Sequence, residues 1–93
     1  MAVHNRVKVS YKGKVFVVKN YLDFTEKTRA LYEKESDTGV KNAVIISLFQ
    51  MTLSPFQEIE YRSLSGGDKL KLSKAWYKTS VGIIEKEEPN IVY

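Results

Sequence analysis

The sequence predicts an α+β domain in which an N-terminal β-hairpin packs on three or four helices. Alternating apolar and polar side chains around a glycine mark the hairpin, at about residues 5–19. Helical spacing of apolar side chains, or helix-capping patterns, mark the segments that follow, at about 21–36, 40–53, 55–64 and 68–80. The chain has 93 residues, 43% of them hydrophobic, so we expect residues 1–93 to form a single compact domain.

The turn of the hairpin is predicted at Gly13, which can adopt the positive φ that tight hairpin turns require. A turn at Lys12–Gly13 and one at Gly13–Lys14 give registers that differ by two residues, so both place the same side chains on each face. One face carries Val7, Val9, Tyr11, Phe16 and Val18, and the other carries Arg6, Lys8, Ser10, Val15, Val17 and Lys19. The first face is apolar enough to cover a core, whereas the second is basic with two valines between the charges.

Segment 21–36 is predicted to be the first helix. Asn20 and Asp23 are both able to cap its start, and Asp23 with Glu26 has the spacing of a capping box. The positions expected to face the core are Tyr21, Phe24, Thr28, Leu31 and Tyr32. Gly39 closes the loop that ends this helix.

Segment 40–53 is predicted to be the central helix of the domain. One helical face would carry Val40, Ala43, Val44, Ser47, Leu48 and Met51. Val44, Ile45 and Ile46 also suit a buried strand, because β-branched residues lose rotamers in helices, but a length of about fourteen residues favours a helix. Phe49 and the two isoleucines extend the apolar surface, so we expect burial on more than one side.

Capping patterns predict the two remaining helices. Ser54 followed by Pro55 and Gln57 favours a helix at 55–64, while the alternation over 58–62 leaves a strand as the alternative. Asp68 is the expected cap of a last helix at 68–80. The core face of that helix would carry Leu72, Ala75, Trp76, Thr79 and Ile83.

A third strand near 81–86, paired with the hairpin, is the alternative for the end of the last helix. Gly82 weakens a helix by roughly 1 kcal/mol relative to alanine, and the residues around it are β-branched.

Composition and motifs point away from catalysis. The chain has no cysteine, which excludes disulfides and cysteine-ligated metals, and its one histidine, His4, lies near a terminus. Glu58 with Glu60 and the glutamates of 85–88 fit solvated patterns rather than an acid–base pair. We therefore expect a protein that is not an enzyme, with no catalytic residue, cofactor, metal site or small-molecule substrate.

The placing of apolar residues predicts an intracellular, cytoplasmic protein without membrane association. Apolar residues near the N-terminus alternate with basic ones, unlike a signal peptide. The longest apolar run, 43–49, is far shorter than the roughly twenty residues that span a bilayer.

The distribution of charge and apolar residues supports two functional hypotheses. The apolar surplus around 40–53, with Val15, Val17 and the tail at 91–93, favours a protein-interaction or assembly factor, in one form a homo-oligomer. Residues 1–22 hold five basic and no acidic residues of a chain with net charge +4, so the alternative is a nucleic-acid-binding module. Its surface would join the basic hairpin face to a lysine stripe on the last helix, formed by Lys71, Lys74 and Lys78. Tyr77 would be exposed for stacking on a base. The candidate partner-binding residues are Arg6, Lys8, Val15, Val17, Lys19, Lys71, Lys74, Tyr77 and Lys78.

Overall fold

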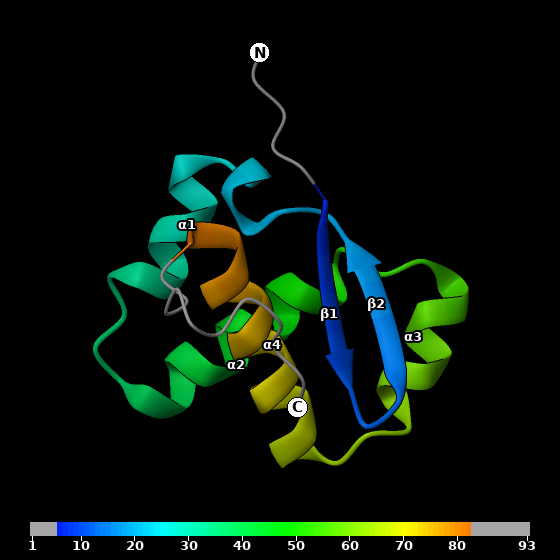
Figure 1. Cartoon of the computed structure of the whole chain (residues 1–93). Coiled ribbons are helices and arrows are strands. Elements are labelled where there is room, and N and C mark those ends of the chain that lie inside the picture. Colours follow the sequence, from blue (N-terminus) through cyan, green and yellow to red (C-terminus); the bar gives the residue numbers. More distant parts are fainter. Residues whose placement is uncertain (1–5, 83–93) are drawn as a thin grey trace.

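A computed structural model of the protein describes residues 6–82 and shows a β-hairpin followed by helices (Figure 1). Its elements are β1 Val7–Tyr11, β2 Lys14–Val18, the 3-10 helix η1 Tyr21–Asp23, α1 Glu26–Glu33, α2 Thr38–Gln50, α3 Pro55–Arg62 and α4 Gly66–Val81. The α+β class, the hairpin and the four predicted helical regions are therefore confirmed within the described part of the chain.

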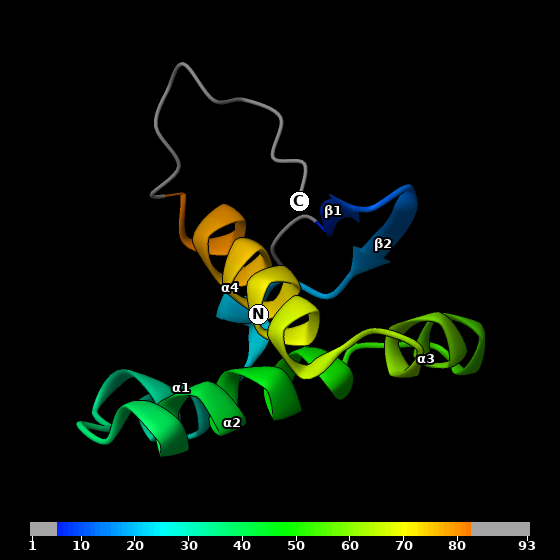
Figure 2. The same cartoon turned by 90° about the horizontal axis from the view of Figure 1, so that it is seen from below.

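The elements form two layers. Figure 2 shows α1, α2 and α3 along one side of the molecule, with α4 and the hairpin on the other side. α4 contacts both β1 beside it and α2 in the opposite layer. The buried apolar side chains gather into one cluster between the layers.

The hairpin turns at Lys12–Gly13, the first of the two predicted turns. Both residues have positive φ, 49° and 79°, which is the conformation of a two-residue hairpin loop. Val9 pairs with Phe16, and Val7 pairs with Val18. The predicted apolar face is buried, and the opposite face is exposed at its basic residues and valines.

Trp76 of α4 is fully buried at the centre of the core. Its ring meets Tyr21 and Phe49 edge-on, at centroid distances of 5.6 and 5.4 Å. Its Nε1 donates a hydrogen bond of 2.7 Å to the carbonyl oxygen of Lys19, where the chain leaves the hairpin. Trp76 therefore contacts both layers and also fixes the backbone at Lys19, where the chain leaves the hairpin.

Two buried serines of α4 have hydrogen-bond partners. Ser80 Oγ accepts a bond of 3.0 Å from the backbone N–H of Tyr21. Ser73 Oγ donates to the carbonyl oxygen of Lys69 at 2.8 Å and lies 3.2 Å from Tyr61 Oη, so the tyrosine is the donor in that second contact. These bonds offset the cost of burying the serine hydroxyls.

The segment predicted as one helix at 21–36 is divided. Asn20 caps the 3-10 turn η1, and Thr25 rather than Asp23 caps α1 through its Oγ1, which accepts from the N–H of Thr28 at 3.2 Å. Phe24 between them is extended, with φ −74° and ψ 153°. This break lets the Phe24 ring reach Trp76, at a centroid distance of 6.2 Å.

The helix predicted at 40–53 is present as α2, and the strand alternative for it is wrong. Its predicted core face is also largely wrong, because Val40, Ala43, Ser47 and Met51 are exposed. The buried side chains are Ile45, Leu48 and Phe49. Phe49 sets this orientation, because its ring packs on Phe16, Tyr61 and Trp76.

The N-cap residues determine where the last two helices begin. Ser54 and Gln57 form the predicted capping box of α3, so the strand alternative there is wrong. α4 is capped by Ser65 rather than by Asp68, which lies in its first turn.

The third strand is not formed over its first two residues. Val81 is the last residue of α4, and Gly82 caps that helix in the left-handed conformation, with φ 71°. The rest of the predicted strand and Ile83 lie outside the described residues.

The carboxylate of Asp68 ties α4 to the hairpin turn. It accepts hydrogen bonds from the hydroxyl of Tyr11 and from Lys12 Nζ, the latter at 3.0 Å. The bond from Tyr11, followed by that from Lys12, lowers the pKa of Asp68 below its ordinary value of 3.8. Asp68 follows Tyr11 by 57 positions and Lys12 by 56, so these bonds join distant parts of the chain.

Replacing Gly13 with alanine should destabilise the protein by about 1–2 kcal/mol, because an L-residue is strained at positive φ. Gly67→Ala is the matched control, since a Cβ meets nothing within 4 Å at either position and Gly67 is helical. We expect Gly67→Ala to stabilise by about 0.4–1 kcal/mol. Urea unfolding of both variants measures the difference, and an equal effect at the two positions would contradict the argument.

The contribution of Asp68 to stability should depend on pH. Because its pKa is lowered by folding, this contribution is present above the ordinary value of 3.8 and is lost as the pH falls through the folded pKa. Tyr11→Phe removes the largest cause of the shift. We expect it to destabilise the protein at neutral pH and to do so less below about pH 4.

Urea unfolding of the wild type and Tyr11→Phe between neutral and acidic pH measures this effect. Lys12→Met should give a smaller pH-dependent loss, because Lys12 is the second cause of the shift. In an Asp68→Asn background, the pH-dependent part of the Tyr11→Phe loss should vanish. A loss that stays constant with pH would refute the assignment.

Candidate functional site

The exposed side of the hairpin forms a mixed basic and apolar surface. We call it the outer hairpin face, and it consists of Arg6, Lys8, Ser10, Val15, Val17 and Lys19. Lys8 lies directly opposite Val17, and Ser10 lies opposite Val15. Val15 and Val17 are 48% and 45% exposed, so water contacts apolar groups beside Lys8 and on toward the turn. Lys19 Nζ also lies 4.5 Å from the centre of the Phe24 ring.

Helix α3 is held beside β2 by a hydrogen bond. Gln57 Nε2 donates to the carbonyl oxygen of Val17 at 3.1 Å. On another side of the helix, Glu58 accepts bonds from Gln50 of α2 and from Arg62. These two bonds, Gln50 first, lower the pKa of Glu58. The Glu58 side of α3 therefore faces α2.

Phe56 and Ile59 lie on the side of α3 that faces water. Phe56 precedes Glu58 by two residues, which places it about 160° around the helix from the side that faces α2. Its side chain is 84% exposed and that of Ile59 is 69% exposed. Phe56 also neighbours Gln57, which reaches β2. We group the exposed apolar residues of these two neighbouring elements, Val15 and Val17 of β2 and Phe56 and Ile59 of α3, as the β2–α3 apolar surface, in which Ile59 lies on the side of α3 away from Gln57.

Phe56 and Ile59 are not among the candidate binding residues predicted from the sequence. Their exposure depends on Tyr61 of the same helix, which is fully buried in the core. Once Tyr61 fixes the inner side of α3, the helical repeat puts the other two apolar residues outside.

The predicted lysine stripe on α4 is exposed at Lys71, Lys74 and Lys78. It lies on the side of the helix away from Trp76, which contacts α2. Because α4 lies in the same layer as the hairpin and contacts β1, the stripe and the outer hairpin face stand on neighbouring elements (Figure 2).

Tyr77 is half-buried, not exposed as expected for a base-stacking residue. Its ring lies 4.7 Å from that of Tyr21 and 5.0 Å from that of Tyr32. Burial, and then the nearby charge of Glu33, raise the pKa of Tyr77. We therefore leave Tyr77 out of the candidate surface.

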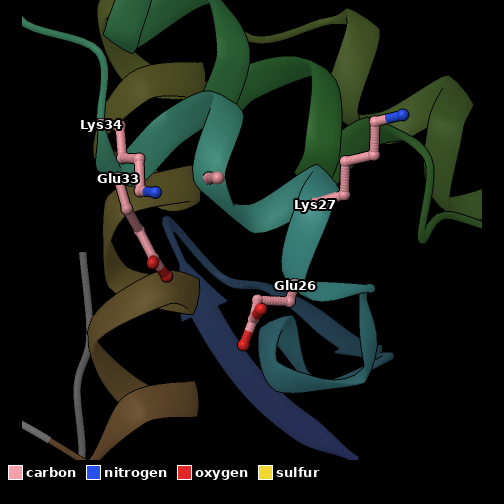
Figure 3. Close-up of a pocket in the computed structure, with 5 residues that line it drawn as sticks. Glu26, Lys27, Glu33 and Lys34 are labelled. Atoms are coloured by element: carbon pink, nitrogen blue, oxygen red, sulfur yellow. The ribbon is translucent and has the colours of Figure 1, made fainter.

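A shallow depression lies along α1 and is lined by Glu26, Lys27, Ala30, Glu33 and Lys34. Lys27 extends away from Glu26 and Glu33 (Figure 3). Glu33 is also engaged by the hydroxyl of Tyr21, at 2.7 Å. One helix with mixed charges lines the depression, so it offers no convergent set of polar groups.

Metal-binding clusters and membrane-spanning helices are both absent from residues 6–82. Within residues 6–82, no group of three or more His, Cys, Asp or Glu side chains is arranged to hold a metal ion. None of the helices described is long and apolar enough to cross a membrane.

Comparisons of the chain with protein-family models, with curated protein sequences and with solved structures found no match.

Proposed function

We propose that this protein is a small non-enzymatic protein-interaction or assembly factor that binds its partner through the β2–α3 apolar surface. The observation that carries the proposal is the exposure of Phe56, whose side chain is 84% accessible to water. A phenylalanine that becomes fully buried contributes about 1.5–3 kcal/mol relative to leaving it exposed. A partner that covers Phe56 recovers this free energy.

The neighbours of Phe56 make this a surface rather than a single exposed residue. Ile59 lies one turn along α3, and Gln57 connects the start of the helix to Val17 of β2. Exposed apolar residues gathered on one side of a helix, as Phe56 and Ile59 are, commonly mark a protein interface. Phenylalanine is also among the aromatic residues that are enriched in protein interfaces relative to the rest of the surface.

Helix α2 adds a second exposed apolar region. Val40 and Met51 remain 47% and 71% exposed, because the helix buries its other side. The apolar surplus of this segment, noted in the sequence, is thus left partly unburied. This supports association with another chain, including a second copy of the protein.

The alternative proposal is a nucleic-acid-binding module. It is favoured by the lysine stripe of α4, which is exposed in the same layer as the outer hairpin face. In this case Lys74→Ala would weaken binding to all sequences alike and reduce the dependence of affinity on salt. We rank it second, because phosphate binding makes no use of Phe56 and Ile59.

The protein-interaction proposal predicts a loss of association in the double variant Phe56→Ser/Ile59→Ser. Both side chains are more than two-thirds exposed, so the cost to folding should stay within about 0.5 kcal/mol for each residue. Leu31→Ser is the matched control, because Leu31 is 61% exposed on α1, outside this surface. Urea unfolding checks that all variants fold.

Association is measured by sedimentation over a concentration series and by quantitative co-purification from cells. The Leu31→Ser variant should still self-associate or co-purify with the same proteins as the wild type. The Phe56→Ser/Ile59→Ser variant should lose this association. The variant Lys71→Ser/Lys74→Ser/Lys78→Ser separates the alternative, since it should lose nucleic acid and keep protein partners. If all variants sediment as monomers and co-purify with the same proteins as the wild type, the proposal is wrong.

A further inference from the structure

We propose that the outer hairpin face binds an acidic segment of a partner protein that carries apolar side chains among its acidic ones. This inference rests on the proposed function and names the chemistry of the partner. Residues 6–19 hold five basic side chains and no acidic one.

The basic side chains of the outer hairpin face are exposed, although Lys19 Nζ rests over the Phe24 ring. Lys12 is paired with Asp68, and Lys14 is half-buried at the start of β2. Arg6, Lys8 and Lys19 are exposed and form no ion pair within residues 6–82. The charge of the face is thus uncompensated by its described surroundings, and it attracts an anionic partner.

A second copy of the chain does not match this face. Placing two outer hairpin faces together would bring Arg6, Lys8 and Lys19 of each copy against the same cations of the other. Like charges in contact disfavour such a complex. Self-association would use the exposed apolar residues of α2 and α3 instead.

A phosphate backbone matches only part of the face. Val17 stands directly opposite Lys8 and two residues before Lys19, Val15 stands opposite Ser10 nearer the turn, and both valines are nearly half exposed. Phosphates would pair with the lysines and leave the aliphatic groups in contact with water or charge. A polypeptide can supply a carboxylate and an apolar side chain a few ångströms apart, because neighbouring residues carry them.

The alternation of the strand suits an extended partner segment. Outer side chains of β2 repeat every second residue, about 6.6 Å apart along the strand. Apolar partner side chains would cover Val15 and Val17 and reach toward Phe56, while acidic ones would meet Lys8 and Lys19. The apolar contacts supply affinity, and the charges supply orientation and association rate.

The test uses the full chain and a synthetic peptide as the probe. The peptide is about twelve residues long, enough to span a strand, and alternates glutamate with valine. In one control peptide lysine replaces glutamate, and in the other serine replaces valine. Fluorescence anisotropy measures affinity, and amide chemical shifts locate the binding site.

We expect the acidic apolar peptide to bind more tightly than either control and to shift the amides of the hairpin. Val15→Thr/Val17→Thr keeps the branched side chains but removes apolar contact, and Lys8→Ser/Lys19→Ser removes charge. Each residue changed should weaken binding by about two- to fivefold, through the lost ion pair at the lysines and the lost apolar contact at the valines. Lys71→Ser/Lys74→Ser is the matched control and should leave affinity unchanged. Raising the ionic strength from about 0.05 to about 0.5 M should also weaken binding.

Several outcomes overturn the inference. Shifts confined to α4, or full competition by nucleic acid together with no effect of Val15→Thr/Val17→Thr, would assign the surface to phosphate. If the peptide leaves the wild-type hairpin amides unchanged but Glu85→Lys/Glu87→Lys/Glu88→Lys shifts them, the occupant is the chain's own acidic segment. If the peptide does not bind but Phe56→Ser/Ile59→Ser abolishes association, only the inference fails. If neither effect is seen, the proposed function fails as well.

Discussion

The burial of Trp76 is the constraint on which the other elements depend. Its ring is packed against Phe49 of α2 and Tyr21 of η1, and its indole N–H is bonded to the carbonyl oxygen of Lys19. A buried indole needs both a close-fitting apolar surface and a partner for its N–H. One side chain therefore sets the spacing of the two layers and the point at which the chain leaves the sheet.

Local patterns predicted the hairpin and α3, because the determining groups are close together in the sequence. Gly13 and a period of two residues are enough to assign the two hairpin faces, and the capping box at Ser54 is enough to start α3. The start of α1 and the orientation of α2 depend on distant contacts. The break at Phe24 follows from packing on Trp76, and α2 is apolar on so many sides that only the contacts of Phe49 select its inner face.

The candidate surface was predictable to the same degree. The outer hairpin face follows from strand alternation alone, so its members could be named from the sequence. Phe56 and Ile59 could not, because their exposure depends on the burial of Tyr61 in a helix whose neighbours were unknown. Tyr77 was predicted to be exposed but is half-buried, because its ring packs on that of Tyr21, which lies far away in the chain. Whether an aromatic side chain is exposed therefore depends on which residues pack against it in the folded protein.

The hydrogen bond from Gln57 to Val17 has a consequence for aggregation. A two-stranded sheet has two edges with unpaired backbone groups, and such edges recruit strands from other molecules. In this hairpin Val17 belongs to a pair that is not hydrogen-bonded, so its carbonyl points outward along the free edge of β2. The amide of Gln57 occupies that acceptor, and α3 stands where an additional strand would begin. Helix α3 therefore hinders a further strand from pairing with β2, while the side chains of the outer hairpin face stay exposed.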